Sequence, residues 1–521
     1  MSTKQNGGGD VAAERSKASD GDDAGGGEDR DRLSALPDDV LVLILLHLDT
    51  KNAARTSVLS RRWRRVWTLL PELRFGIVRQ SQHLWDALSV SDVPLRYLLV
   101  GALVDPSPQS LAAWLLTAAR RVSGELILIN FVTERNAEDS DEEEATERGA
   151  FELPCFEKAT SISLDLGFLG ISVPPNGVFA RLKSSPSLVL GDLGDVVSSP
   201  RCPCLQKLTV CHARGLDRIS IDSESLQVLE LRNPHGLRQL TVVAPALRDL
   251  SVMQCFLNEQ NQPVVNISAP QLKSLKWVDT YDPSFVHLGN TEHLQTFGTL
   301  FFVYGPHGFT QNRACLMLLP RFKAIENLTL SLVYMLEADN LQYMMEDMTV
   351  LPDIKCLHLI VMALGHAFGA GPFHVLRICS GIQRLILVLS TRFELKEETA
   401  CSSGCICDQP TVWKTEELSL NHLQELEIQE FRASEHEVAF VKRLLNWATV
   451  LKMMTVTFHH SISDSKAKEL FQMFRSLSNP GVCMEFYIYQ EFRMRFHFEF
   501  VHFKGKIVFN VAENSKSLLR A

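Results

Sequence analysis

The feature that most constrains the fold is a short apolar pattern, L-x-x-L-x-L with Val or Ile substituting, which recurs from Leu205 onward. In its most regular part, successive units start 10 or 11 residues apart, so a full repeat spans about 21 residues. These units are Leu205-Leu208-Val210, Leu216-Ile219-Ile221, Leu226-Leu229-Leu231, Leu237-Leu240-Val242 and Leu247-Leu250-Val252. The later units are longer and less regular: Leu272-Leu275-Trp277, Leu294-Phe297, Ile325-Leu328-Leu330, Ile354-Leu357-Leu359, Ile382-Leu385-Leu387, Leu423-Leu426-Ile428 and Leu451-Met454-Val456.

In each unit the last two apolar positions alternate, so on a short strand both side chains point to the same face. One strand cannot bury such a row alone, whereas stacked neighbours form a parallel sheet with a continuous core. The period lies within the range of leucine-rich repeats. We therefore predict an α/β fold in which residues 76–410 form an irregular, right-handed leucine-rich-repeat solenoid with a wide concave surface. Because the repeat leucines form its core, partner contacts should come from the residues between them and from the long loops.

Residues 31–75 have a different, helical pattern. Pro37 suits the first position of a helix, and the two aspartates that follow it suit the positive end of the helix dipole. Thr50 and Ser60 are candidate N-caps of two further helices. Apolar residues of the first helix recur at helical spacing: Val40, Leu41, Ile44, Leu45 and Leu48. The pattern predicts three short helices.

The last of these helices has two chemically different faces, and Pro71 ends it. The apolar face carries Trp63, Val66, Trp67 and Leu70, and the polar face carries Arg61, Arg62, Arg64 and Arg65. Three short helices cannot bury this much apolar surface by themselves. We therefore expect some of it to face a partner.

A dense set of residues in this segment matches one known family. It comprises Leu36-Pro37-Asp38-Asp39-Val40-Leu41, Ile44, Leu48, the run from Ala54 to Arg64 and Trp67. Together they resemble the F-box of plant F-box proteins. The resemblance implies docking onto a Skp-family adaptor, which in turn binds a cullin scaffold. The implied adaptor-binding residues are Leu36, Pro37, Val40, Leu41, Ile44, Leu48, Val58, Leu59, Trp63 and Trp67.

A second set of residues lies near the C-terminus. It runs from Glu416 to Ile428, continues through Glu437, and ends with Leu451 to Val456. This segment looks like the FBD domain that follows leucine-rich repeats in plant F-box proteins. Its pattern predicts a strand, an amphipathic helix and another strand. We expect an FBD-like region over residues 411–490 that caps the open end of the solenoid, followed by a C-terminal segment, 491–521.

Two polar segments contain too few large apolar residues to form a core. Residues 1–30 are mostly Gly, Asp, Ser and Ala, which predicts a disordered tail. Residues Glu134 to Arg148 contain a run of acidic residues. This run predicts a solvated loop insertion, with an electrostatic docking site as the alternative.

Cys401, Cys405 and Cys407 form a cluster with metal-like spacing. A structural zinc site needs four ligands, usually in two pairs, and here the nearest histidine in the sequence is His422. We favour a plain or redox-sensitive loop over a zinc site, and we predict no metal and no cofactor. The remaining cysteines mostly stand alone in apolar stretches, as is typical of reduced core residues in an intracellular protein.

Several functional classes lack support in the sequence. The motifs G-x-S-x-G, G-x-x-x-x-G-K-[ST], G-x-G-x-x-G and H-E-x-x-H do not occur, so we predict that the chain is not an enzyme. A net charge of -9 argues against a nucleic-acid partner, and the helix face explains the arginine cluster. No apolar run approaches the roughly 18 residues of a membrane span. No apolar segment typical of a secretory signal follows Met1. We expect neither a nucleic-acid nor a membrane partner.

These patterns lead to one main hypothesis. The chain is expected to be a substrate-recognition adaptor of an SCF-type (Skp-cullin-F-box) ubiquitin ligase, acting in the nucleus and/or the cytoplasm. Its F-box would dock the Skp-family adaptor, and its repeats would hold an unknown target protein. The alternative is an interaction scaffold that acts outside ubiquitination. Intact docking residues, such as Leu36, Ile44 and Trp63, favour the first hypothesis.

Overall fold

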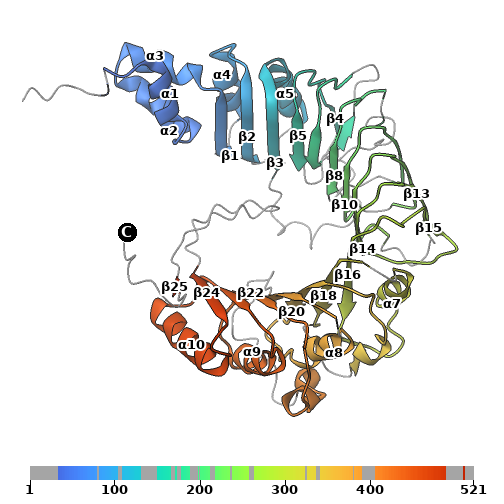
Figure 1. Cartoon of the computed structure of the whole chain (residues 1–521). Helices are drawn as coiled ribbons and strands as arrows, with labels where there is room; N and C mark the ends of the chain where they lie inside the picture. Colours follow the sequence, from blue (N-terminus) through green and yellow to red (C-terminus); the bar gives the residue numbers. More distant parts are fainter. Residues whose placement is uncertain are drawn as a thin grey trace, which may run out of the picture.

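The chain forms an open arc, with the N-terminal helices at one end and α10 (Asp464–Leu477) at the other (Figure 1). The computed structural model describes residues 33, 35–78, 81–103, 108–130, 150–165, 170–172, 178–187, 198, 200–211, 217–234, 237–256, 263–322, 325–335, 341–379, 381–389, 405–488 and 509–510. The predicted disordered tail, the acidic segment 134–148, Leu216 and Cys401 lie outside these residues.

The N-terminal segment forms the three predicted helices. They are α1 (Asp38–Leu45), α2 (Thr50–Arg55) and α3 (Arg61–Val66), with the short 3₁₀ turns η1 (Thr56–Val58) and η2 (Trp67–Leu69). Pro37 is the N-cap residue of α1, one position earlier than predicted. Ser60 caps α3 as predicted, since its hydroxyl accepts a hydrogen bond from the backbone N–H of Trp63.

The predicted capping role of Thr50 is wrong. Asp49 caps α2 instead, because its carboxylate accepts a 2.7 Å hydrogen bond from the backbone N–H of Asn52. Thr50 is the first residue of the helix and is 4% exposed. Its hydroxyl accepts a 2.6 Å hydrogen bond from the backbone N–H of Arg74, on the first strand. Thr50 therefore ties the helices to the sheet.

A sheet of 17 described strands runs along the arc. Each of these strands pairs with the next one along the chain, and all the pairs are parallel except the last, which is antiparallel. The strands are β1 (Glu72–Val78), β2 (Leu95–Leu103), β3 (Val122–Asn130), β5 (Ser161–Asp165), β7 (Ser184–Ser187), β8 (Lys207–Cys211), β10 (Val228–Arg232), β12 (Asp249–Met253), β14 (Ser274–Val278), β16 (Thr296–Phe302), β18 (Asn327–Val333), β20 (Cys356–Met362), β21 (Arg384–Leu389), β22 (Glu425–Phe431), β23 (Met453–Phe458), β24 (Cys483–Ile488) and β25 (Phe509–Asn510). The sheet starts at Glu72, before the expected boundary at residue 76.

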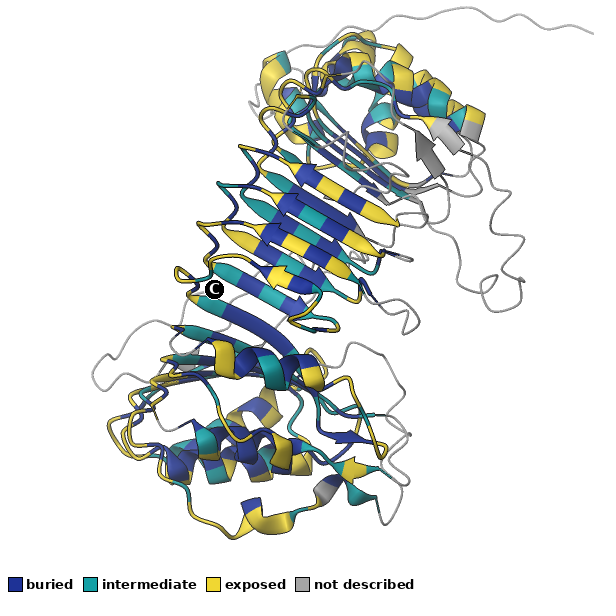
Figure 2. Cartoon of the chain, turned by 90° about the vertical axis from the view of Figure 1, so that its right-hand side faces the viewer, coloured by how far each residue is buried: buried dark blue, intermediate teal, exposed yellow. Residues whose placement is uncertain are grey.

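The most regular repeats supply two sheets rather than the expected single one. Leu208 pairs with Leu229 and Leu229 with Leu250, each 21 residues apart, in the main sheet. The units between them form a second parallel sheet: β9 (Arg218–Asp222), β11 (Gln239–Val243), β13 (Val264–Ser268) and β15 (Val286–Leu288). Buried and exposed residues alternate along these strands (Figure 2). The spacing of 10 or 11 residues is therefore half of one repeat.

Helices lie along the outer side of the arc in its C-terminal half (Figure 1). These helices are α7 (Arg313–Leu318), α8 (Ala370–Ile378), α9 (Glu435–Trp447) and α10. The predicted strand, helix and strand near the C-terminus are confirmed as β22, α9 and β23. Because β24 pairs with β23, this unit is not the last in the sheet.

The remaining elements are short or lie near the N-terminus. They are α4 (Ser81–Ser89), α5 (Pro108–Arg121), the strand pairs β4 (Ala150–Glu152) with β6 (Gly170–Ser172) and β17 (Tyr304–Gly305) with β19 (Gln342–Tyr343), and the turns η5 (Leu319–Arg321), η6 (Met345–Asp347), η7 (Ile406–Asp408) and η8 (Thr411–Lys414). Among the described residues, no helix has the length and apolarity needed to cross a bilayer.

Candidate functional site

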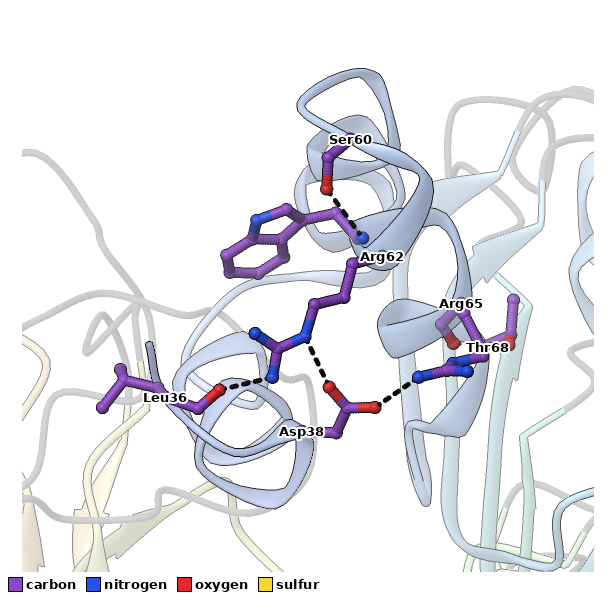
Figure 3. A network of polar contacts seen from close by, with 7 residues as sticks. Leu36, Asp38, Ser60, Arg62, Arg65 and Thr68 are labelled. Atoms are coloured by element: carbon purple, nitrogen blue, oxygen red, sulfur yellow. Dashed lines mark hydrogen bonds and ion pairs between the residues drawn. The ribbon is translucent and has the colours of Figure 1, made fainter. Parts of the chain in front are cut away.

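One carboxylate links α1 to α3 at the N-terminal end of the chain (Figure 3). Asp38, in the first turn of α1, accepts hydrogen bonds from Arg62 at 2.7 Å and from Arg65 at 2.9 Å, both on α3. Arg62 also donates to the backbone carbonyl of Leu36. The hydrogen bond from Arg62, followed by that from Arg65, lowers the pKa of Asp38 below its ordinary value of 3.8. Two of the four arginines predicted on the polar face therefore fix α1 against α3.

Most of the predicted adaptor-binding residues lie at the surface. Val58 and Leu59, at the turn between α2 and α3, are 83% and 66% exposed. The other exposed members are Pro37, Val40, Ile44 and Leu48. Leu36, Trp63 and Trp67 are half-buried, because they also pack against the core of the chain itself. Exposed apolar side chains on such small helices mark a surface that another protein can cover.

The prediction that Leu41 contacts the adaptor needs correction. Leu41 is 0% exposed and lies in the core of the chain, so it cannot be a direct contact of an adaptor in this structure. Helical spacing placed Leu41 and Ile44 on one broad stripe, but the core takes only part of that stripe. Conversely, Leu33, Leu43 and Leu69 are exposed and were not among the predicted residues. Leu43 lies three positions after Val40, so helical spacing places the two residues on the same face and could have indicated that Leu43 is exposed.

The inner face of the main sheet presents a second surface. Half-buried apolar residues alternate with the buried positions of β16, β18, β20 and β21. Because helices cover the outer side of the sheet in this half of the arc (Figure 1), the buried positions belong to the outer face and the half-buried ones to the inner face. Strand register aligns Leu300 with Ile360 and Val388, through Ser331. We call this set the apolar strip: Leu300, Phe302, Val333, Ile360, Met362, Ile386 and Val388.

Charged residues flank the apolar strip. On one side, separated from β16 by β12 and β14, Lys207 and Arg232 both contact Glu230, at 3.4 and 2.8 Å. On the other side, Arg384 binds Glu427 at 2.9 Å. An apolar centre with a polar rim is the usual composition of a protein-binding surface.

His358 lies in the strand next to these charges. Burial lowers the pKa of His358 below its ordinary value of 6.5, and Glu427 only partly opposes this. The imidazole is therefore neutral at pH 7 and adds no charge to the inner face.

The cysteine segment gains a ligand that the sequence did not indicate. One group of three potential metal ligands occurs among the described residues, and it consists of His366, Cys405 and Cys407. His422, the nearest histidine in the sequence, is exposed and not in the group. No local pattern reveals His366, because it lies 39 residues before Cys405.

Two profiles of known proteins match parts of this chain. The profile of the F-box domain matches residues 33–75. The profile of the leucine-rich repeats of the FBD-associated F-box protein At5g56370 matches residues 190–298. The first match covers the three helices, and the second covers the strands from β8 to β15 with part of β16.

Similar proteins come from Arabidopsis thaliana. The putative F-box/FBD/LRR-repeat protein At4g03220 is 28% identical over 270 residues, which cover 49% of this chain and 53% of that protein. The FBD-associated F-box protein At4g10400 is 28% identical over 262 residues, 47% of this chain and 60% of that protein. The F-box/FBD/LRR-repeat protein At2g04230 is 60% identical over 45 residues, 9% of this chain and 10% of that protein.

Local identity is thus highest over a segment of F-box length, and the chain spans about half the length of the curated relatives that it matches over longer stretches. The chain carries an F-box and FBD-associated leucine-rich repeats, and its relatives are F-box/FBD/LRR-repeat proteins of Arabidopsis.

Proposed function

We propose that this chain is the substrate-recognition subunit of an SCF-type ubiquitin ligase. F-box proteins generally act as substrate adaptors of such ligases, and their F-boxes bind Skp-type adaptors. The observation that carries the proposal is the exposed apolar surface of the F-box helices, with Val58 and Leu59 at its most exposed point. Burial of these side chains against a Skp-family adaptor would contribute about 1.5–3 kcal/mol for each fully covered residue.

The second half of the proposal concerns the target protein. The apolar strip lies inside the arc, between the ion pairs Lys207–Glu230 and Arg384–Glu427. A target held there would be presented to a ubiquitin-conjugating enzyme carried by the cullin. The chain would contribute proximity and orientation, which raise the effective concentration of the reacting groups, and no bond chemistry of its own. We propose that this takes place in the nucleus and/or the cytoplasm.

The decisive experiment is co-purification of the full chain with a plant Skp-family adaptor. Two double variants test the docking surface: Leu36→Ala with Pro37→Ala, and Val58→Ala with Leu59→Ala. The matched control is Val243→Ala with Val264→Ala, because these exposed valines lie on the second sheet. We expect the wild type and the control to bind the adaptor and both docking variants to lose it. The variant Val58→Ala with Leu59→Ala should keep the thermal unfolding of the wild type, because both side chains are exposed.

Failure of the wild-type chain to bind any Skp-family adaptor would favour a scaffold outside ubiquitination. A separate variant, Ile360→Asp with Val388→Asp, tests the target surface. It should keep adaptor binding while abolishing ubiquitination of the target in a reconstituted ligase.

We also propose the finer division of the chain. Residues 31–75 would be the F-box, 76–410 the irregular, right-handed solenoid and 411–490 an FBD-like cap, between the tail 1–30 and the segment 491–521. Pairing of β22 with β21 supports the capping role, because β22 covers an edge that would otherwise be open. Truncation before residue 411 should therefore yield an aggregating protein. A monodisperse truncated chain would argue against the cap.

A further inference from the structure

Three potential metal ligands that lie far apart in the sequence come together at one point. The ligand atoms of His366, Cys405 and Cys407 all lie within 4.8 Å of one another. The Sγ atom of Cys405 lies 3.4 Å from Nδ1 of His366. His366 and Cys407 are buried and Cys405 is half-buried. The proposed adaptor function uses none of these side chains.

The one short separation, between Cys405 and His366, suits a tetrahedral zinc ion. With Zn–S bonds of about 2.3 Å and Zn–N bonds of about 2.0–2.1 Å, neighbouring ligand atoms lie roughly 3.5–3.8 Å apart. The distance between Cys405 and His366 is close to such an edge. Two thiolates and one imidazole, without a carboxylate, are donors that suit zinc rather than magnesium or calcium.

A tight turn after β20 orients His366. Leu364 and Gly365 both have left-handed backbone conformations, with φ of 50° and 87°. The turn is closed by a 2.9 Å hydrogen bond from the backbone N–H of His366 to the carbonyl of Ala363. A leucine in this conformation is strained and persists only where the surroundings hold it. The backbone just after His366 is indeed held, because the buried hydroxyl of Tyr334 donates to the carbonyl of Phe368 at 2.8 Å.

The segment that carries the cysteines is anchored by a second tyrosine. The hydroxyl of Tyr304 lies within hydrogen-bond distance of the carbonyls of Ile406, Cys407 and Gln409, and the distance to Cys407 is 3.1 Å. The rings of Tyr304 and Tyr334 lie 5.7 Å apart. Adjacent tyrosines therefore fix the two loops that carry the three ligands.

Close packing also joins these loops. A Cβ atom at Gly369 would overlap the ring of Trp413, so only glycine permits this approach. Phe440 of α9 contacts both loops, since its ring lies 5.6 Å from Phe368 and 5.9 Å from Trp413. The ligands thus belong to a preorganised part of the core, as a metal site requires.

We propose that His366, Cys405 and Cys407 bind a zinc ion that joins the turn after β20 to the connection between β21 and β22. Both cysteines bind as thiolates, so each releases its proton when the ion enters. Water or one further donor fills the fourth tetrahedral position. The ion acts as a cross-link in the half of the arc that carries the apolar strip.

The test uses the full chain, purified with reductant, loaded with zinc and dialysed. Elemental analysis should find about one zinc ion per chain for the wild type. Cys405→Ser and His366→Asn should lose most of this zinc. Cys204→Ser and His422→Ala are matched controls, since both residues are exposed and lie outside the cluster, and they should retain it. Cobalt in place of zinc should give the visible bands of tetrahedral Co²⁺ and a thiolate-to-cobalt charge-transfer band.

A measurement on the wild type alone keeps the proposal testable if a variant fails to fold. Removal of the ion by a chelator should lower the Tm, because a metal that binds only the folded chain stabilises it. An unchanged Tm would overturn the proposal, as would equal zinc retention by the wild type and Cys405→Ser. A disulfide between Cys405 and Cys407 without any zinc uptake would favour the redox-sensitive loop. These outcomes do not depend on whether the chain binds a Skp-family adaptor.

Discussion

The Nε atom of Arg62 on α3 lies 2.7 Å from the carboxylate of Asp38 on α1, and this contact joins two of the three helices of the F-box. We predict that Asp38→Asn weakens binding of the Skp-family adaptor several-fold. The amide cannot form the ion pairs with Arg62 and Arg65, so the docking residues on the two helices lose their fixed spacing. Titration calorimetry with the purified adaptor measures the change.

Asp39 provides the control for this prediction, because it is exposed in the same turn of α1. Asp39→Asn should leave the affinity unchanged. Since the paired charges are near the surface, added salt should narrow the difference between Asp38→Asn and the wild type. Equal adaptor affinities of Asp38→Asn and Asp39→Asn at low salt would show that the ion pairs of Asp38 do not support docking.

Leu41 and Val58 should separate folding from docking. Leu41→Ala removes a fully buried side chain and should lower the free energy of unfolding by about 2–5 kcal/mol. Val58→Ala should change this free energy by less than about 0.5 kcal/mol, because the side chain is 83% exposed. Val58→Ala should nevertheless weaken adaptor binding. Urea unfolding and adaptor titration of both variants test this prediction. Normal adaptor binding by Val58→Ala would show that Val58 is not part of the docking surface.

Thr50 should control the stiffness of the connection between the F-box and the sheet. Thr50→Val keeps the shape of the side chain but leaves the backbone N–H of Arg74 without its acceptor, at a cost of about 1–3 kcal/mol. Hydrogen exchange at the amide of Arg74 should become faster in this variant. Thr50→Ser retains the hydroxyl and should protect that amide as the wild type does. Equal exchange in all three proteins would show that the hydroxyl is dispensable.

Glu437 predicts a pH dependence of stability. It is 7% exposed at the start of α9, where it accepts hydrogen bonds from the backbone N–H groups of Arg432 and Ser434. Burial raises the pKa of Glu437 from 4.5 to about 7, despite these bonds and the nearby charge of Arg432. Below pH 4.5 the folded and unfolded chains both hold the proton. Between pH 4.5 and about 7 only the folded chain keeps it, so stability falls as the pH rises through this window.

The full effect of Glu437 is on the order of 3 kcal/mol. Glu437→Gln should flatten this part of the stability profile, because glutamine serves the same capping position without a charge. Glu435→Gln, an exposed neighbour in the first turn of α9, should leave the profile unchanged. Urea unfolding across the window gives the slopes. A slope in Glu437→Gln as steep as in the wild type would assign the effect to another group.

The sequence predicted the repeated half of the fold through one physical requirement, that each short strand must bury its apolar row against a neighbour. Leu208, Leu229 and Leu250 do stack in register. The assignment of alternate units to two sheets was missed, because a period of 10 or 11 residues is the same whether successive strands share a sheet or not. Strands such as β2, whose apolar residues run almost continuously from Leu98 to Leu103, lack the repeat pattern and were not predicted.

The exposure of the candidate residues can be predicted where local sequence determines it, but not where distant residues do. Val58 and Leu59 belong to a dense local match and are exposed. Leu41 belongs to the same match, yet it is buried in the core of the chain. His366 reaches Cys405 only because strands β20 and β21 stack side by side, which no spacing along the chain reveals.

The chain passes from η2, which ends at Leu69, to β1, which begins at Glu72, within two residues. Leu70, one of those two, is buried. Under the proposed ligase function, so short a junction would limit how far the F-box helices can turn relative to the sheet. A protein bound inside the arc would then have a fixed orientation relative to the ubiquitin-conjugating enzyme. The lysines within range would then be selected by the curvature of the sheet, and targets with the same binding segment but differently placed lysines would be modified unequally.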